Sequence, residues 1–421
     1  MASETVLERR RRVLGEHSLL FYDTPLHMVR GEDVWLYDAD GKKYLDVYNN
    51  VPQVGHCHPR VVAALSQQAA TLNVHTRYLN ERVLDYAERL TSKFAPELSR
   101  AMFVCTGTEA NELAIRIARR TTGKRGIIVT DCNYHGHSTI LAELTTGIPQ
   151  AEPFPDYGRT ISIPDMLRSP LSEEELLRQH LAQVQEAIAS LDAAGFGVAA
   201  LLVDTLFSTE GLPVVPQGYL EAVVKLVREA GGLVIADEVQ PGFARMGDAF
   251  WGHQHYAFTP DIVTMGKPIG NGHPMAALVT RPDIADPFCA QSMYFNTFGG
   301  NPVSAAVGLA VLDVIDDEGL LQNAHDLGSY IRKGLEYLQD RHELAAHVRG
   351  RGLFFGIELL RDGVAAAAET KTLINTMVNL GVLVSRIGPE GNVLKMRPPL
   401  TFRREHADTL IAALDRAFAE L

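Results

Sequence analysis

The sequence predicts an α/β protein with a large doubly wound mixed sheet and a smaller α+β part that is built from both ends of the chain. Short apolar runs alternate with helical patterns over Ala101–Thr280, as expected for strands covered by helices on both faces. Long helical patterns and further strands follow. We expect residues 1–60 to form the N-terminal segment of the small domain, residues 61–320 the large domain, and residues 321–421 the C-terminal part of the small domain.

The composition is that of an ordinary globular enzyme. Apolar residues make up 46% and charged residues 21% of the 421 residues. The formal net charge of −12 argues against nucleic acid or an anionic membrane as a partner. The basic run Arg9–Arg12 has acidic neighbours, as on a solvated helix face. No stretch approaches the roughly 20 apolar residues of a membrane span.

Cysteine usage and the N-terminal residues favour the cytoplasm. The cysteines are few, widely spaced and without a CxxC pair: Cys57, Cys105, Cys132 and Cys289. This spacing is typical of a reducing compartment, and not of a disulfide scaffold or a zinc knuckle. The N-terminal residues lack the apolar stretch and cleavage site of a signal peptide. We therefore expect a cytoplasmic protein.

The first third of the chain predicts a hairpin and then strand–helix units. Strand-like runs flank Asp40-Gly41, a strong hairpin signal. Apolar residues then recur at helical spacing from Arg60 onward. Ala101–Cys105 is expected to be a strand that leads through a turn of small residues into an amphipathic helix over Glu109–Arg120, and another strand is expected over Gly126–Thr130.

The rest of the chain continues the alternation. Residues 145–175 are rich in proline and threonine and predict a surface excursion near the site, after which Ser172 caps a helix. A buried strand runs from Ala199 to Asp204. The other expected elements are helices over Tyr219–Ala230, Ala305–Glu318, Asn323–Arg341 and from Arg404, strands in RGLFFGIELL and GVLVSR, and a turn in KMRPPL.

Two of the buried strands each lead to a charged residue. The apolar runs Leu233–Ala236 and Asp261–Met265 are followed by Asp237 and Lys267. Because ligands bind at the carboxyl ends of strands in open α/β sheets, both side chains are expected at one catalytic edge. A lysine can form a Schiff base and an aspartate can hold a charged ring nitrogen, so the pair indicates a pyridoxal phosphate site. Singly, either residue could be a surface lysine or a helix cap.

Small and aromatic residues near other strand ends fit a flat anionic cofactor. The turn around Gly107 and Thr108 opens a helix, where backbone N–H groups and the helix dipole favour a phosphate. The same residues also fit a simple capped helix start with Thr108 as N-cap. Tyr134 follows a strand and could stack on a ring. The HxH pairs at His56/His58 and His135/His137 lack a third ligand, so loop packing is favoured over metal binding.

Blocks along almost the whole chain resemble the class III (ω) pyridoxal-phosphate aminotransferase family. They are VGHCHP, TGTEAN, YHGH, IADEVQPGFARMG, TMGKPIGNGHP, FNTFGGNP and RPPL, in family order. The resemblance implies fold type I and a homodimer with shared sites. In the implied site Lys267 carries the cofactor as an imine, Asp237 holds the ring nitrogen, and Val239 and Tyr134 cover the ring faces. Further implied cofactor contacts are Gln240 at the ring hydroxyl, Gly107 and Thr108 at the phosphate, His135, and Thr297 from the neighbouring subunit.

Within that family the chain resembles the ethanolamine-phosphate phospho-lyase branch. The phrases NNVPQVGHCHP, FWGHQ and PDIVTMGKPIGNGHP carry this resemblance, together with YFNTFGGNPVSAAVGLAVLDVI. Two departures from the transaminase pattern agree with it. Lys395 stands three residues before Pro398, where transaminases of α-amino acids usually carry arginine near the Pro-Pro, and Asp204-Thr205 replaces the usual Glu-Pro. The resemblance implies elimination of phosphate from O-phosphoethanolamine, which gives acetaldehyde, ammonia and phosphate.

The substrate phosphate needs cations, and the sequence offers Arg77, Lys395 and Arg397, with Asn50 as a further contact. Ordinary ion pairing is the alternative for these cations. An ω-transaminase that moves an amino group from an amine to a keto acid is the main alternative function. A hydrolase or metalloprotein built on the His pairs, and a cofactor-free binding protein, are weaker hypotheses, because neither explains why Lys267 and Asp237 occur together.

Overall fold

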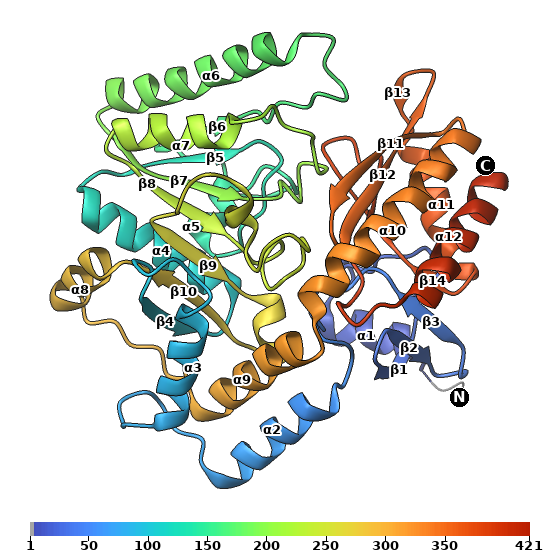
Figure 1. The fold of residues 1–421 in the computed structure, drawn as a ribbon, viewed down its shortest axis with the longest axis horizontal. Helices are drawn as coiled ribbons and strands as arrows, with labels where there is room; N and C mark the ends of the chain where they lie inside the picture. Colours follow the sequence, from blue (N-terminus) through green and yellow to red (C-terminus); the bar gives the residue numbers. More distant parts are fainter. Residues whose placement is uncertain (1–3) are drawn as a thin grey trace.

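A seven-stranded sheet forms the centre of the larger lobe in the computed structural model, which describes residues 4–421 (Figure 1). Its strand order is β4-β10-β9-β8-β7-β5-β6. β10 is antiparallel to both neighbours and the other pairs are parallel, so the sheet is mixed, as predicted. The strands are β4 (Arg100–Val104), β5 (Gly126–Thr130), β6 (Gly158–Ile161), β7 (Val198–Asp204), β8 (Leu233–Asp237), β9 (Ile262–Met265) and β10 (Ala276–Thr280).

Helices cover both faces of this sheet. Along β5, Ile127 and Val129 pack into one apolar cluster and Ile128 into another, because successive side chains of a strand point to opposite faces. The helices on one face are α4 (Gly107–Thr122) and α8 (Pro282–Gln291), and those on the other are α6 (Glu173–Ala193) and α7 (Tyr219–Glu229). The doubly wound arrangement is therefore confirmed.

Further helices complete the larger lobe and lead into the smaller one. They are α1 (Val6–Leu14), α2 (Pro59–Thr71), α3 (Glu81–Thr91), α5 (Thr139–Leu144) and α9 (Pro302–Asp317), with short 3₁₀ turns η1 (Gly252–His255) and η2 (Lys267–Gly270). α2 and α3 both pack against α9. Within residues 4–421, no helix combines the length and the apolar content needed to cross a bilayer.

The smaller lobe joins the two ends of the chain in space. One sheet has the order β1-β2-β3-β14, so a C-terminal strand pairs in parallel with an N-terminal one. The other sheet has the order β11-β12-β16-β15, with β13 beside β12. The elements are β1 (Met28–Glu32), β2 (Trp35–Asp38), β3 (Lys43–Asp46), β11 (Ala345–Arg351), β12 (Phe354–Arg361), β13 (Val364–Ala365), β14 (Val382–Leu383), β15 (Ser385–Ile387), β16 (Val393–Met396), α10 (Leu320–Arg341), α11 (Ala367–Asn379) and α12 (Arg404–Ala419).

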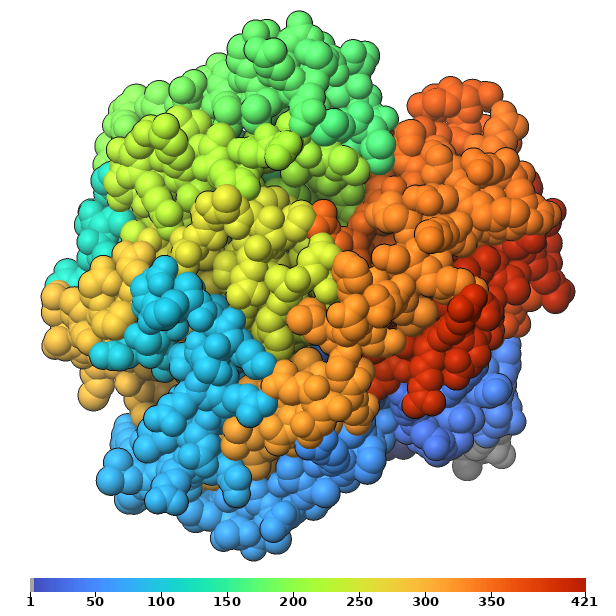
Figure 2. All heavy atoms as spheres, viewed as in Figure 1, coloured from blue at the N-terminus to red at the C-terminus, as the bar shows by residue number. Residues whose placement is uncertain are grey.

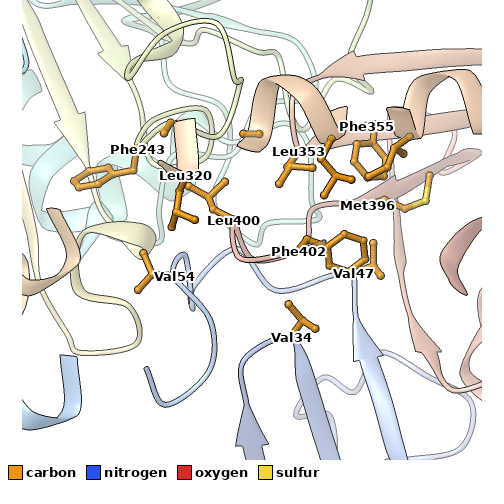
Figure 3. Packing of buried hydrophobic residues seen from close by; sticks show 14 of the residues in the cluster. Val34, Val47, Val54, Phe243, Leu320, Leu353, Phe355, Met396, Leu400 and Phe402 are labelled. Carbon is orange, nitrogen blue, oxygen red and sulfur yellow. The ribbon is translucent and has the colours of Figure 1, made fainter. Parts of the chain in front are cut away.

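One apolar core runs from the larger lobe into the smaller one. Figure 3 shows Phe243, from the segment after β8, in the same packed region as Leu320 of α10 and Phe355 of β12. Val34 and Val47 of the N-terminal segment belong to the same cluster. On the face in Figure 2 the orange helical segment of α10 lies against the yellow segment near residue 248, where His325 Nδ1 is 3.2 Å from Asp248 Oδ1. Because the core is continuous, the boundaries at residues 60 and 320 stay a prediction.

Three local predictions need correction. Residues 145–175 contain β6, an edge strand whose four residues carry no apolar run and which pairs with β5 through its backbone. The expected turn in KMRPPL begins only after Met396, because Lys395 and Met396 belong to β16. The single strand expected in GVLVSR is two strands, β14 and β15, that join different sheets.

A buried cluster of charges ties the excursion before α6 to the smaller lobe. Arg349 of β11 donates hydrogen bonds to Asp165, at 2.7 Å, and to Glu358 of β12. Arg349 is only 2% exposed. Arg168, beside Asp165, pairs with the same Glu358 carboxylate, which is fully buried, and with the exposed Glu390 at 2.8 Å. Glu358 is thus the shared anion of two arginines from the two lobes.

Replacing Glu358 with Ala is expected to destabilise the protein by about 3–5 kcal/mol, because it leaves Arg349 buried without its main partner. Chemical unfolding followed by circular dichroism measures this loss. Glu390→Ala removes the exposed partner of the same Arg168 and serves as the matched control, with an expected change of about 0–1 kcal/mol. Equal losses for both variants would contradict the assignment.

Candidate active site

The structure brings Asp237 and Lys267 to one pocket at the carboxyl edge of the large sheet. Asp237 is the last residue of β8, and Lys267 follows β9, the neighbouring parallel strand. Both side chains line the same pocket. The other lining residues are Gly107, Thr108, Asn111, Tyr134, His135, Gly136, Asp204, Val239 and Gln240. This set includes every cofactor contact expected from the sequence except Thr297.

Asp237 is buried and held in its ionised form. Its Oδ2 accepts a hydrogen bond from Asn111 Nδ2 at 2.8 Å and lies 2.8 Å from His135 Nδ1, while Oδ1 accepts the Val239 N–H at 3.0 Å. Burial alone would raise the pKa of Asp237, but the hydrogen bond and charge of His135, with the other two donors, lower it below its ordinary value. A carboxylate that stays charged in an apolar setting is suited to hold a cationic ring nitrogen.

Lys267 projects into the pocket from a strained backbone position. Its φ angle is +31°, in a region that non-glycine residues rarely adopt and that costs roughly 1–3 kcal/mol. Burial, followed by the charge of Arg397, lowers the pKa of the Lys267 amine. This shift makes the neutral amine more accessible, which is the form that reacts with carbonyl groups and accepts protons.

The start of α4 forms an anion cradle. Thr106 is the N-cap and pairs with Glu109 in a capping box, so the alternative with Thr108 as N-cap is wrong. The backbone N–H groups of Gly107 and Thr108 have no partner among residues 4–421, and a Cβ at Gly136 would lie 2.8 Å from Thr108 Oγ1. Free N–H groups at a helix start, with glycine on the facing loop, fit a phosphate.

Tyr134 and Val239 both line the pocket, and their roles at the two ring faces stay predictions. Tyr134 is about one-third exposed, and Val239 is buried with its methyl groups against Gly107. Gln240 lies beside them and accepts a hydrogen bond from Arg397 Nη1 through its Oε1. Its amide NH₂ therefore remains available to a ligand.

A group of cations lies next to the amine. Lys395 of β16 makes no hydrogen bond or ion pair with any residue of 4–421, and its Nζ is 5.9 Å from the centroid of the Tyr48 ring. Burial, followed by the charges of Arg397 and Lys267, lowers the pKa of Lys395 well below its usual range. Burial lowers the pKa of Arg397 to about 10, and its Nε donates to Tyr48 O at 3.1 Å. These groups lack a full counter-charge.

Besides Lys395 and Arg397, which lie next to the pocket lining and not in it, three further sequence-predicted residues do not line this pocket in the single chain. Arg77 and Thr297 are exposed, and the Arg77 guanidinium lies 3.7 Å from the Phe295 ring centroid. Asn50 is buried at 2% exposure with an unpartnered Nδ2. The roles of all three stay predictions.

Sequence reasoning missed several residues that act through tertiary contacts. Asn111 orients Asp237, and its Oδ1 accepts from Thr264 of β9. Tyr48 packs on both pocket cations, with the Arg397 Cζ 5.4 Å from its ring centroid. Asn111 stands inside the TGTEAN block and Tyr48 directly precedes the NNVPQVGHCHP phrase, so both positions carried a usable signal.

The HxH pairs have structural partners. His56 Nε2 is 2.7 Å from Asp46, and His58 Nε2 is 3.2 Å from Glu318. His137 Nδ1 lies 3.1 Å from Thr108 Oγ1. No group of three or more His, Cys, Asp or Glu side chains that could hold a metal occurs within residues 4–421.

The donors in this pocket fit pyridoxal phosphate. The free N–H groups of α4 match its phosphate, the ionised Asp237 matches its ring nitrogen, and the unpaired Lys267 amine matches its aldehyde. The fold and the pocket are thus those of a fold-type-I pyridoxal-phosphate enzyme.

The chain belongs to the class-III aminotransferase family, which matches residues 22–418. It is 54% identical to a phospholyase from Arthrobacter, solved in complex with phosphoethanolamine, over 99% of this chain and 100% of that one, with a TM-score of 0.97. It is 38% identical to ethanolamine-phosphate phospho-lyase homolog 1 of Caenorhabditis elegans, over 99% of this chain and 93% of the relative. It is 40% identical to a Drosophila melanogaster protein named alanine–glyoxylate aminotransferase 2-like, over 98% of this chain and 86% of the relative.

The cofactor assignment agrees with a solved relative of the same fold. An amine transaminase from an uncultivated Pseudomonas species, in its PLP-bound form, is 29% identical over 100% of this chain and 97% of that chain, with a TM-score of 0.86. The cofactor of this family is pyridoxal 5′-phosphate, and the expectation from the sequence is confirmed.

Lys267→Ala is expected to abolish turnover and leave the fold unchanged, because it removes the pocket-lining amine that is positioned to attach the cofactor's aldehyde. Absorbance of the purified variant should lack the visible band of the attached cofactor, while its circular dichroism matches that of the wild type. Substantial remaining activity would refute the role of Lys267.

Proposed function

We propose that the chain is a phospho-lyase that eliminates phosphate from O-phosphoethanolamine and, with one water molecule, yields acetaldehyde, ammonia and phosphate. The observation that carries the proposal is the unpartnered Lys395 beside Arg397 and Lys267. Buried cations without counter-ions are costly, so the pocket calls for an anionic ligand.

The geometry suits a phosphate better than an α-carboxylate. Arginine clamps a planar carboxylate through two parallel bonds, whereas a lysine is a compact point charge that suits a tetrahedral phosphate. Here Arg397 is already committed to Gln240 and the Tyr48 carbonyl oxygen, and Lys395 is the free group. Phosphoethanolamine carries no carboxylate. It is also the compound named with the Arthrobacter phospholyase, which supports the same substrate class.

The chain's own residues divide the work of the reaction. When bound, pyridoxal phosphate supplies an electron sink for negative charge at the amine-bearing carbon. The Lys267 amine, whose pKa burial and then Arg397 lower, removes the proton from that carbon. Asp237 holds the positive charge of the ring nitrogen through its ionised carboxylate. Lys395 and Arg397 bind the phosphate on the adjacent carbon and stabilise its charge as it leaves.

An ω-transaminase activity is the second candidate, because the Drosophila relative is named as an aminotransferase. Both reactions begin with loss of the same proton. A phosphate on the adjacent carbon allows elimination, while a substrate without a leaving group there can only pass on its amino group. The identity of the leaving group therefore separates the two functions.

Incubation of the holoenzyme with phosphoethanolamine is expected to release phosphate and acetaldehyde in equal amounts. Lys395→Ala should lower kcat/KM about 10- to 100-fold, since a hydrogen bond to a charged group contributes roughly 1.5–3 kcal/mol. Phosphate and aldehyde assays measure both effects.

Arg386→Ala is the matched control, because it removes an exposed cation from the neighbouring strand β15 and should leave kcat/KM nearly unchanged. Absence of phosphate release, together with efficient amino transfer from an amine to pyruvate, would sink the lyase proposal in favour of the transaminase.

A homodimer with shared sites is part of the proposal. The 72–79/293–298 surface, named here for its two segments, is apolar and exposed: Leu72, Tyr78, Leu79, Met293 and Phe298 are 47–100% exposed. His75 and Arg77 both pack on Phe295, so the two segments are contiguous. Exposed apolar patches of this kind are typical of protein interfaces. Covering this surface with a second copy would carry Thr297 and Arg77 toward the partner's pocket.

Leu79→Glu, at a fully exposed position of this surface, is expected to give a monomer with little activity, because a charge is buried on dimerisation. Light scattering measures the mass, and Val364→Glu on the exposed strand β13 is the control that stays dimeric.

Mixing inactive Lys267→Ala with Thr297→Ala should restore activity, since hybrid dimers contain one intact site. No recovery in verified hybrids would contradict sharing.

We also propose that the protein works in the cytoplasm. The support is that Cys57, Cys105, Cys132 and Cys289 are all free thiols, as is usual in a reducing compartment.

A further inference from the structure

Asp204 is a pocket residue to which the mechanism above gives no task. It is the last residue of β7 and pairs in register with Asp237 at the end of β8. Its side chain lines the same pocket and the residue is 6% exposed. Two carboxyl groups on adjacent parallel strands thus face one ligand site, although only Asp237 is needed for a ring nitrogen.

The two carboxyl groups have different surroundings. Asp237 has three donors on its two oxygens, whereas Asp204 accepts the Leu206 N–H on Oδ1 at 2.8 Å and has the Ser208 hydroxyl as its other donor. Oδ2 of Asp204 takes no part in the bond to Leu206. A protonated Oδ2 could donate a hydrogen bond to a ligand oxygen, which a carboxylate cannot do.

The charges of Asp237 on β8 and His135 after β5 act on Asp204. The charge of Asp204 acts in turn on Glu210 after β7 and on Tyr256. The charge of Asp204 is felt in turn by Lys267, by Lys395 of β16 and by Arg397. Asp204 therefore shares its space with the cations that we assign to the substrate phosphate. Burial, followed by the charge of Asp237, raises the pKa of Asp204 to about 7.

We propose that Asp204 is a further phosphate-binding residue, which lies beside Lys395 and Arg397 in the free enzyme and takes up a proton to donate a hydrogen bond to the bound phosphate. Loss of that proton then favours release of the phosphate product. This inference rests on the proposed function, because it assumes that the cations bind the substrate's phosphate.

The test uses sulfate as the probe and the holoenzyme as the protein, so that the cofactor's phosphate site is already filled. Sulfate keeps its charge between about pH 6 and 8, whereas phosphate itself titrates in that range. Wild-type affinity is expected to fall about tenfold from pH 6 to 8 through Asp204 alone, since a group with a pKa of about 7 must be reprotonated for each sulfate bound. Infrared difference spectra should show a protonated-carboxyl band on binding.

Asp204→Asn keeps a donor but cannot titrate. Its affinity for sulfate should match that of the wild type within a few-fold at pH 6 and should not show the tenfold fall toward pH 8. It should therefore bind sulfate about tenfold more tightly than the wild type at pH 8. Its infrared difference spectrum should lack the protonated-carboxyl band. Asp204→Glu restores an acid and should restore the band, and the cofactor's absorbance verifies that each variant is folded and loaded.

The outcomes distinguish a failure of the role of Asp204 from a failure of the proposed phospho-lyase function. An unchanged band and an unchanged pH dependence in Asp204→Asn would overturn the role of Asp204 alone. A wild-type holoenzyme that does not bind sulfate in competition with phosphoethanolamine would overturn the assignment of the cations, and with it both proposals.

Discussion

The active site depends on keeping one buried carboxylate charged. Asp237 is nearly excluded from water, and an isolated carboxylate there would take up a proton. His135, Asn111 and the Val239 N–H prevent this, and each comes from a different part of the chain. The strand order brings them together, because β8 lies at the centre of the sheet with β9 on one side and β7 on the other. The rest of the pocket is arranged around this charge.

The second constraint is the balance of charge around the reacting carbon. Burial, followed by the charge of Arg397, lowers the pKa of the Lys267 amine, while Lys395 has no ion-pair partner among residues 4–421. The same cationic group thus tunes the base and receives the leaving group. A phosphate dianion would supply the missing negative charge. The fold is shared with transaminases, so we attribute the difference in outcome to these few cations and to the substrate's leaving group.

The sequence predicted the parts that depend on local pattern and on strand ends. The runs before Asp237 and Lys267 marked the catalytic edge, because parallel strands end at a common edge of the sheet. The sequence does not indicate β6, because four residues at a sheet edge need only backbone pairing. It predicts one strand in place of β14 and β15, because the change of sheet at Val384 leaves no trace in hydropathy. Tyr48 reaches the pocket cations only through the tertiary fold, and Arg77 and Thr297 lie outside the pocket of one chain, so strand-end patterns alone do not place them.

A crystal structure of the Lys267→Ala holoenzyme with phosphoethanolamine tests the central claim most directly, because the substrate would stay intact in the site. The account predicts the phosphoryl group within hydrogen-bond distance of Lys395 Nζ and close to Arg397. A phosphoryl group that points away from both cations, toward solvent or elsewhere in the pocket, would contradict it.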